Sequence, residues 1–465
     1  MLNLYNSFTK SLEEVDLPAD EIKLYLCGPT VQSSPHIGHG RSAVVFDFLI
    51  RYLKYLNHEV IFVRNITDID DKIINKSLEQ NIDFREIASK VITEFTDAYT
   101  NLNCLSPDFE PKATEYIDEI IVYINKILEK NMGYVSESGV YFDTAGFPDY
   151  LKLSGRKSEE VISGTRVDIQ EDKRAPEDFA LWKFSKEGEP YWESTWGKGR
   201  PGWHIECSTM INSILGSEID FHCGGNDLIF PHHENELAQS KAANPDNNFV
   251  KYWLHNGMIN LSGKKMSKSE GNVKSLKNYI DEYGGDTMRF YFLRAQYRSP
   301  QEFSEELLIE SETTFKKISE FVKETKAEPL DKNLMNLFED CLGDDLNTPK
   351  LIGEIFAQIN QAVSLSESAL NNLKATIRYI FVILGFTFIK IEKQKLSDEE
   401  LTKYFEQYEI VYSSTEQAMN EYIKIREQYR AEQEYEIADN MRNNLLEIGI
   451  KIEDGKNDGW SWNNN

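Results

Sequence analysis

Residues 22–66, IKLYLCGPTVQSSPHIGHGRSAVVFDFLIRYLKYLNHEVIFVRNI, decide the fold of this chain. The alternating run 22–27 ends at Gly28-Pro29, which predicts a strand that runs into a loop. Ser34-Pro35 then supplies an N-cap and a proline for the first helical turn, and the apolar residues that follow recur with a helical period. The β-branched run 59–66 predicts a second strand. A strand, a helix and a strand within about 45 residues form a βαβ unit, so we expect a Rossmann-like α/β domain with a parallel sheet.

The rest of the chain divides into regions of different pattern. Its 465 residues are too many for one ordinary core, so several domains are expected. We predict the first half of the catalytic domain at 1–100, a connective insertion at 101–195, and the second half, with a candidate metal site, at 196–255. A region with a lysine-rich loop follows at 256–309. From 310 to 465 strand signals fade and amphipathic helices follow, which predicts an all-α C-terminal domain.

Charge and cysteine content limit the classes of protein to which the chain can belong. A net charge of −26 argues against a general nucleic-acid binder, because contacts to phosphate require a basic surface. Five cysteines, odd in number and unevenly spaced, do not suggest a disulfide framework. The N-terminus lacks the pattern of a signal peptide, and the most apolar run, 379–386, is far shorter than a membrane span. We therefore expect a cytoplasmic protein with no membrane partner.

Two short motifs have the composition of a phosphate-binding site. His36-Ile37-Gly38-His39 lies at the start of the predicted helix, where unpaired amides and the helix dipole favour an anion such as a triphosphate. Gly38 lets a substrate lie close to the backbone, and the two histidines can donate to phosphoryl oxygens. In the loop 263–271, Lys265 and Lys268 suit a clamp on developing phosphate charge. Each motif alone has a simpler reading, a chance match for the first and a solvated loop for the second.

Four residues of metal-binding type lie far apart in the sequence. Cys27 ends the first predicted strand, Cys207 lies in a tryptophan-rich segment, and His232 and Glu236 are four residues apart on one helix face. Two thiolates, an imidazole and a carboxylate suit zinc, although the spacing is not that of a zinc finger. On spacing alone, buried thiols beside a polar helix face are an equal alternative.

Longer segments carry a resemblance to a known family. In their order and separation the two short motifs are similar to the HIGH and KMSKS signatures of class I aminoacyl-tRNA synthetases. From about residue 1 to 305, and more faintly at EDG (453–455), the chain resembles the cysteinyl-tRNA synthetase family. The segments that carry the resemblance are CGPTV (27–31), NITDIDDK (65–72), KR (173–174), DFALWK (178–183), WGKGRPGWHIEC (196–207), GGND (224–227) and YRSP (297–300).

The resemblance implies an enzyme that activates L-cysteine with ATP and transfers it to tRNA(Cys), with AMP and pyrophosphate released. It implies one Zn²⁺ per subunit, Mg-ATP as a substrate and a monomeric chain. By matching positions, zinc is held by Cys27, Cys207, His232 and Glu236, and the substrate thiol joins them. The residues matched to the cysteine pocket are Gly28, Thr67 and Trp203, those matched to catalysis are His36, His39, Lys265 and Lys268, and those matched to ATP binding are Gly38 and Lys268.

The same resemblance makes the helical region an anticodon-binding domain, although this region is acidic too. We therefore expect tRNA recognition by a small basic and aromatic set, because unpaired bases stack on exposed rings. The candidates are Lys424, Arg426, Arg430, Arg442, Trp460 and Trp462. For each of them the simpler reading is a solvated helix residue or a packed tryptophan.

The sequence departs from the family pattern at two places, and two other functions stay open. Gln32-Ser33-Ser34-Pro35 replaces an aromatic-acidic pair, and Glu270 replaces a leucine after the second signature. The alternatives are a cysteine ligase of the same fold that acts on an amino-sugar, and a non-catalytic zinc-binding paralogue. The remaining cysteines and histidines are predicted to be structural: Cys104, Cys223 and Cys341 as buried thiols, and His58, His204, His222 and His255.

Overall fold

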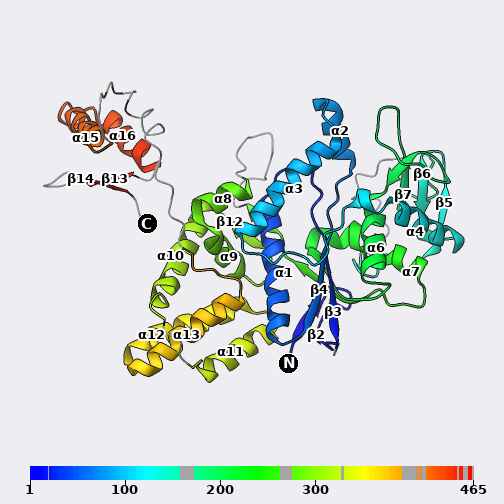
Figure 1. Cartoon of the computed structure of the whole chain (residues 1–465), viewed down its shortest axis with the longest axis horizontal. Helices are drawn as coiled ribbons and strands as arrows, with labels where there is room; N and C mark the ends of the chain where they lie inside the picture. The colour runs from blue at the N-terminus through cyan, green and yellow to red at the C-terminus, as the bar shows by residue number, and fades with distance from the viewer. Residues whose placement is uncertain are drawn as a thin grey trace. The chain divides into compact units, whose positions relative to one another are not determined.

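The computed structural model describes residues 1–18, 20–157, 172–261, 275–325, 329–389, 405, 408, 410, 415–447, 450–453 and 459–462. The chain separates into two compact units, Met1–Ile389 and Lys390–Asn465 (Figure 1). The predicted domain boundaries at 100, 195, 255 and 309 all fall inside the first unit and remain predictions. Among the described helices, none is long and apolar enough to cross a lipid bilayer.

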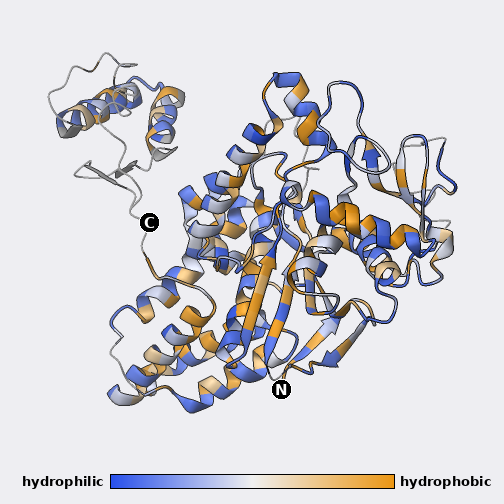
Figure 2. Ribbon diagram, turned by 45° about the vertical axis from the view of Figure 1, so that its right-hand side comes forward, coloured by the Kyte–Doolittle hydropathy of each residue, from blue (hydrophilic) through white to orange (hydrophobic). Residues whose placement is uncertain are grey.

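A four-stranded parallel sheet forms the centre of the first unit, in the order β10-β9-β3-β4. β3 (Glu21–Leu26) and β4 (Glu59–Arg64) are the two strands predicted from the opening segment, and α1 (Ile37–Tyr55) connects them. β9 (Ile219–Gly225) and β10 (Val250–Asn256) come from the second half of the chain. Figure 2 shows the central strands mostly in the hydrophobic colour, as expected for a parallel sheet covered on both faces. The predicted Rossmann-like α/β architecture is confirmed.

The start of α1 differs from the prediction. Ser34-Pro35 was expected to cap the helix and begin its first turn, yet the helix begins at Ile37 and His36 is the N-cap in an extended conformation. The carbonyl of Pro35 instead accepts a hydrogen bond from the amide of Leu276, at 2.9 Å. The amide of His36 donates to Nδ1 of His39, at 3.1 Å, and so closes the helix end locally. A tertiary contact and the histidine pair thus displace the local capping signal.

The predicted insertion contains a second, antiparallel sheet in the order β5-β6-β7-β8. Its strands are packed against α4 (Ile117–Glu129) and α6 (Trp203–Ile214) around the buried Trp182. Helices α2 and α3 precede it, and α7 follows the sheet in sequence. The bounds of these elements are β5 (Gly133–Val135), β6 (Gly139–Phe142), β7 (Phe179–Phe184), β8 (Gly199–Pro201), α2 (Asp71–Gln80), α3 (Phe84–Asn101) and α7 (Glu234–Ala243).

Helices α8 to α13 continue the core of the first unit. Buried residues of α1, such as Phe46 and Leu49, belong to the same hydrophobic cluster as Phe338 and Phe381 from the later helices. Two short strands pair in parallel: β11 (Ile259–Leu261) follows β10 in sequence, and β12 (Gln301–Phe303) directly precedes α10. The helices are α8 (Leu276–Tyr283), α9 (Gly285–Leu293), α10 (Glu305–Phe321), α11 (Lys332–Gly343), α12 (Thr348–Gln361) and α13 (Glu367–Ile383). Near the N-terminus, β1 (Asn3–Asn6) and β2 (Ser11–Glu14) form an antiparallel pair.

The second unit contains α15 (Thr415–Ala431) and α16 (Tyr435–Glu447), packed around Met419, Tyr422 and Met441. An antiparallel pair, β13 (Ile450–Glu453) and β14 (Gly459–Trp462), adds to the helices predicted for this region. Of the predicted tRNA contacts, Arg426 is only 2% exposed and its Nε donates to the carbonyl of Ala438, so it is a structural residue. Lys424 is exposed and pairs with Glu421, at 3.0 Å.

Candidate metal and substrate site

A cavity of about 790 Å³ opens at the carboxyl ends of the parallel strands. Its lining includes the segment after β3, the first turn of α1, and the segment after β10. In a doubly wound sheet this edge is where ligands bind, because the strand ends and helix N-termini converge there. The lining residues include Cys27, Gly28, His36, Gly38, His39 and Trp203. Cysteine-pocket and HIGH-motif residues predicted from distant parts of the sequence therefore share one cavity.

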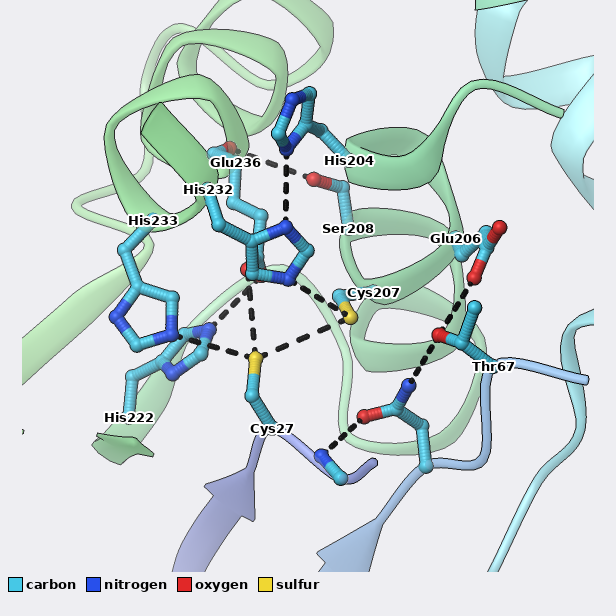
Figure 3. Close-up of polar contacts among 12 residues, drawn as sticks. Cys27, Thr67, His204, Glu206, Cys207, Ser208, His222, His232, His233 and Glu236 are labelled. Carbon is cyan, nitrogen blue, oxygen red and sulfur yellow. Dashed lines mark hydrogen bonds and ion pairs between the residues drawn. The ribbon is translucent and has the colours of Figure 1, made fainter. Parts of the chain in front are cut away.

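The four predicted metal ligands converge beside this cavity (Figure 3). Sγ of Cys27 lies 3.9 Å from Sγ of Cys207 and 3.5 Å from Oε1 of Glu236. Nε2 of His232 lies 3.6 Å from Sγ of Cys207 and 3.0 Å from Oε1 of Glu236. A tetrahedral zinc site with ordinary bond lengths spaces its ligand atoms about 3.3–3.8 Å apart. Two sulfurs, one nitrogen and one oxygen at these separations fit a zinc ion.

Local structure explains how residues so far apart meet. Cys27 follows β3 directly, so it lies at the sheet's ligand-binding edge. Cys207 lies on α6 and Glu236 on the first turn of α7, and these two helices pack side by side. His232 lies in a short π-helical turn, Ile229–His233, that leads into α7 and keeps it near Glu236. The i, i+4 relation read from the sequence is therefore preserved in space.

The electrostatics of the cluster favour a thiolate at Cys207. Burial opposes ionisation there, but the hydrogen bond from Cys27 and the neighbouring His232 lower the pKa of Cys207 to about 6. Burial and the adjacent Cys207 raise the pKa of Cys27 well above its ordinary value. Burial lowers the pKa of His232, but Glu236 and Cys207 outweigh it, and the net shift is upward. A cation in the cluster would replace these protons, because thiolates and neutral imidazoles are the metal-binding forms.

A second layer of histidines surrounds the cluster, and the sequence prediction missed it. His204 and His222 were predicted to be merely structural. Nδ1 of His204 lies 2.9 Å from Nδ1 of His232, and Nε2 of His222 lies 2.9 Å from Oε2 of Glu236. His233 places Nε2 3.3 Å from Sγ of Cys27 and contacts His255 through Nδ1 at 2.7 Å. Partners of this kind orient metal ligands. Each of His232, Glu236 and Cys27 therefore has a neighbouring histidine that fixes its orientation.

The same geometry defines a second possible ligand group. Cys27, His222, His233 and Glu236 also place one ligand atom each within 4.8 Å of one another. It shares Cys27 and Glu236 with the predicted set. The adjacent pair His232-His233 was the sequence signal for it, because each histidine of the pair faces one of the two groups.

The predicted cysteine-pocket residues lie next to the cluster. The amide of Gly28 donates to Oδ1 of Asn65, at 2.8 Å, which brings the segment after β3 alongside Thr67. The hydroxyl of Thr67 donates to Oε2 of Glu206, at 2.9 Å. Glu206 is 1% exposed, and burial raises its pKa well above the ordinary value. The sequence prediction did not name Glu206, although it directly precedes Cys207.

Trp203 completes this side of the cavity. Its ring stacks on His232 with centroids 4.3 Å apart, and the residue is 36% exposed. An exposed indole that leans on a metal ligand can cover a small bound substrate while fixing the imidazole.

The HIGH motif occupies the N-terminal end of α1. His36 and His39 stack with ring centroids 3.7 Å apart, and His39 meets the ring of Phe95 edge-on at 5.0 Å. Both histidines and Gly38 line the cavity. Gln32, from the segment 32–35 that differs from the family pattern, lines it too. Lys265, Lys268 and Glu270 lie outside the described residues.

The remaining cysteines match the predicted chemistry only in part. All five cysteines are free, and Cys223 and Cys341 are buried as predicted. Cys104 is only partly buried, and burial together with nearby Asp47 raises its pKa to about 12. A thiol with so high a pKa is unreactive at neutral pH.

Comparisons with known proteins identify the family of the chain. Residues 13–313 match the family model for the class I (C) tRNA synthetase catalytic domain. The cysteine–tRNA ligase of Pseudothermotoga lettingae is 41% identical, covering 97% of this chain and 97% of its own length. The ligase of Thermotoga maritima is 39% identical, covering 97% and 98% respectively.

Solved structures share the fold at low identity. Mycobacterium tuberculosis methionyl-tRNA synthetase, in complex with methionyl-adenylate, superposes with a TM-score of 0.57 at 14% identity, covering 78% of this chain and 89% of its own. The LeuRS of Agrobacterium radiobacter, in a ternary complex with tRNA, gives 0.57 at 10% identity, covering 80% and 84%. These neighbours show the class I synthetase fold. With the catalytic-domain match and relatives about 40% identical over nearly their whole length, the chain belongs to the cysteine–tRNA ligase family of class I aminoacyl-tRNA synthetases.

Proposed function

We propose that the protein is a cysteine–tRNA ligase, which activates L-cysteine with ATP and transfers the cysteinyl group to tRNA(Cys). The observation that carries the proposal is the cluster of Cys27, Cys207, His232 and Glu236 beside a cavity that the HIGH histidines also line. A thiol-selective metal site and an anion-binding helix end in one cavity suit this reaction. We further propose a cytoplasmic enzyme, in keeping with the net charge of −26 and the five free cysteines, and a monomer, as the family resemblance implies.

The donor set favours Zn²⁺ as the metal, with one ion per chain. When bound, zinc supplies a Lewis acid that prefers a thiolate to a serine hydroxyl, which is neither soft nor readily ionised. His204, His222 and His233 hold the ligand side chains from outside, so the ligands are oriented in advance. Selection of this kind makes a separate editing site unnecessary.

Around the metal the chain's own residues position the amino acid. The backbone of Gly28 lines the cavity, and Thr67, which donates to Glu206, presents an oriented oxygen. Trp203 covers the pocket on the side of His232. These contacts align the substrate carboxylate for in-line attack on the α-phosphate of Mg-ATP, since such reactions depend on positioning more than on covalent help.

At the other end of the cavity, His36 and His39 stabilise the charge of the triphosphate. They lie at the N-terminal end of α1, where the helix dipole favours an anion, and Gly38 lets the phosphates approach the backbone. Lys265 and Lys268 are proposed to supply positive charge to the leaving pyrophosphate, as the KMSKS resemblance implies. A terminal hydroxyl of the tRNA then takes the cysteinyl group, and AMP is released.

The two alternative functions have less support. The curated relatives match over 97% of this chain, including the region beyond residue 310, and they carry the ligase name. An amino-sugar ligase would resemble only the catalytic half. A non-catalytic paralogue would not need a phosphate-binding motif, yet His36 and His39 line the same cavity as the metal ligand Cys27.

The test is ATP–pyrophosphate exchange with cysteine, with serine and without an amino acid, followed by charging of total tRNA. We expect exchange only with cysteine and cysteine on one tRNA species. Exchange with cysteine but transfer to an amino-sugar rather than to tRNA would replace the proposal by its first alternative. Absence of exchange in metal-loaded protein would favour the second.

A further inference from the structure

A buried arginine next to the HIGH motif holds one wall of the cavity. Arg41 lies on α1 two residues after His39, and it is completely buried. Its Nη1 donates to the carbonyl of Met258, at 2.9 Å. Its Nη2 contacts the carbonyls of Gln296 and Tyr297, both at 3.3 Å, and that of Ser299 at 2.6 Å. In the described chain no carboxylate pairs with Arg41, so backbone carbonyls alone meet its charge.

The carbonyl of Met258 belongs to the cavity wall. Residues 256–259, which link β10 to β11, all line the cavity, and Met258 itself is 44% exposed. Asn256 is 4% exposed, and its Oδ1 lies among the described buried atoms without a hydrogen-bond partner. The Nδ2 of Asn256 donates to the carbonyl of Gly257, at 3.1 Å, so this side chain holds the backbone of the wall itself. All four residues line the cavity, so a shift of the wall changes the space that a substrate would occupy.

The wall rests against the turn 296–299. The amide of Gly257 donates to the carbonyl of Tyr297, and the amide of Gln301 to that of Met258, both at 2.9 Å. A Cβ at Gly257 would lie 2.2 Å from the carbonyl oxygen of Ser299, so wall and turn touch backbone to backbone. A shift of the turn must move the wall.

One carboxylate fixes the far side of the same turn. Asp345, in the loop between α11 and α12, accepts from Nε of Arg298 at 2.6 Å and from the hydroxyl of Tyr297 at 3.1 Å. It also accepts from Nε2 of Gln296, at 3.0 Å. The turn is thus held between a guanidinium that binds its carbonyls and a carboxylate that binds its side chains.

We infer that Arg41 is a positioning residue for ATP, which acts through the wall 256–259 and the turn that Asp345 anchors. The inference rests on the proposed function. The metal ligands come from the segment after β3, from α6, and from α7 with the turn before it, whereas Arg41 binds carbonyls after β10 and before β12. Arg41 also lies on the helix whose N-terminal end is proposed to bind the triphosphate. Loss of Arg41 should therefore affect ATP far more than cysteine.

The test compares two buried arginines. Arg289 is also completely buried and donates to the carbonyls of Leu102, Asn103 and Leu384. It pairs with Asp47, and none of these three carbonyls belongs to a residue that lines the cavity. We expect Arg41→Lys to raise the KM for ATP in cysteine-dependent exchange about tenfold or more, because small misplacements are costly in catalysis. The KM for cysteine and the zinc content should stay within about twofold. Arg289→Lys should lower thermal stability without the ATP-selective change.

A double-mutant cycle tests the connection to Asp345. Asp345→Asn should produce the same ATP-selective change, and the double variant should lose less than the product of the single effects, because both act on one turn. Asn256→Ala should reproduce the signature as well. If Arg41→Lys does not fold, Asp345→Asn and Tyr297→Phe carry the test.

Two results would overturn the inference: an unchanged KM for ATP in the folded variants, or equal changes for both substrates, as a general structural defect would cause. A failure of the proposed function is distinct from either, since the wild-type protein itself would then show no cysteine-dependent exchange.

Discussion

Gly28 lies where the chain after β3 passes closest to the segment after β4. A Cβ on this residue would stand 1.6 Å from the carbonyl oxygen of Asn65, which belongs to backbone and cannot move aside cheaply. The close approach holds the segment after β3, which lines the cavity through Cys27 and Gly28, against the segment that carries Thr67. Glycine is required at this position because a larger side chain would collide with the backbone of Asn65, and not because the backbone is left-handed.

Replacing Gly28 by alanine should therefore destabilise the protein and widen the pocket. We expect a loss of about 1–3 kcal/mol in the free energy of unfolding, together with a higher KM for cysteine. Urea unfolding and exchange kinetics measure the two effects. Gly353→Ala is the control, because a Cβ there meets nothing within 4 Å on α12, so it should be neutral or slightly stabilising.

Cys207 is the ligand whose removal tests the metal site most directly. Cys207→Ser should reduce zinc affinity by more than the roughly 10- to 100-fold typical of losing an outer partner, and cysteine activation should fall with it. Elemental analysis of purified protein gives the zinc content. Cys223→Ser, which changes a buried thiol outside both ligand groups, should keep the metal. Full zinc occupancy in a Cys207→Ser/His232→Ala double variant would disprove the ligand assignment.

At the scale of elements, the β3–α1–β4 unit was predictable because its strands and helix are long enough for their periods to show. The start of α1 was not, since the contact of Pro35 with Leu276 joins residues far apart in sequence. In the insertion sheet, β5 and β8 have only three residues each and β6 has four, so alternation cannot be recognised in them. Short elements are defined by their partners, which a sequence does not display.

The candidate site, too, was only partly predictable from the sequence. Its ligands come from three separate segments, so their spacing alone did not identify a metal site, and the ligand set was predicted from the family resemblance. The outer histidines stand on β9, β10, α6 and the turn before α7, and each looks ordinary in its own segment. Only the tertiary fold reveals that they form a layer around the ligands.

That layer predicts sensitivity to acid. Burial, followed by the charge of His222, lowers the pKa of His255 to about 3 from its ordinary 6.5, so between these values the unfolded chain binds a proton that the folded chain does not. Stability is therefore complete above about pH 6.5 and falls as the pH drops toward 3. Burial lowers the pKa of His233 in the same direction.

Urea midpoints between pH 7.5 and 5.5, measured at saturating zinc, should fall in the wild-type protein. His255→Gln removes one titrating group, so its free energy of unfolding should fall less steeply with pH, by up to about 1.4 kcal/mol per pH unit. Parallel slopes in the two proteins would mean that His255 is protonated equally in both states.

For the whole molecule, one hydrophobic core extends from the parallel sheet into the helices that follow residue 310. The predicted domain boundary at 309 lies within a hydrophobic core that joins α1 to α13. A cut near residue 305 would expose that core, whereas the division between compact units lies after Ile389. The helices before and after that division can therefore have different roles.

A chain that ends at Ile389 should separate the two steps of the reaction. The first unit holds the sheet, the cavity and the metal cluster, so cysteine-dependent exchange should stay within about twofold of the full chain. If Lys390–Asn465 contacts tRNA, the KM for tRNA should rise about tenfold or more, which corresponds to about 1.4 kcal/mol. Equal charging by the two chains would show that the second unit has another role.

The contacts of Asp345 also bear on how the chain is made. The amide of Tyr5 donates to the Asp345 carboxylate at 2.9 Å, across a separation of 340 residues. Leu2 and Leu4 are buried in a core that includes Leu342 and Leu346. Residues near Tyr5 are synthesised 340 residues before Asp345, so they must wait for this partner to emerge from the ribosome. In a cell this strand cannot complete its packing until the loop that carries Asp345 is made, and a chaperone has a long interval in which to hold it.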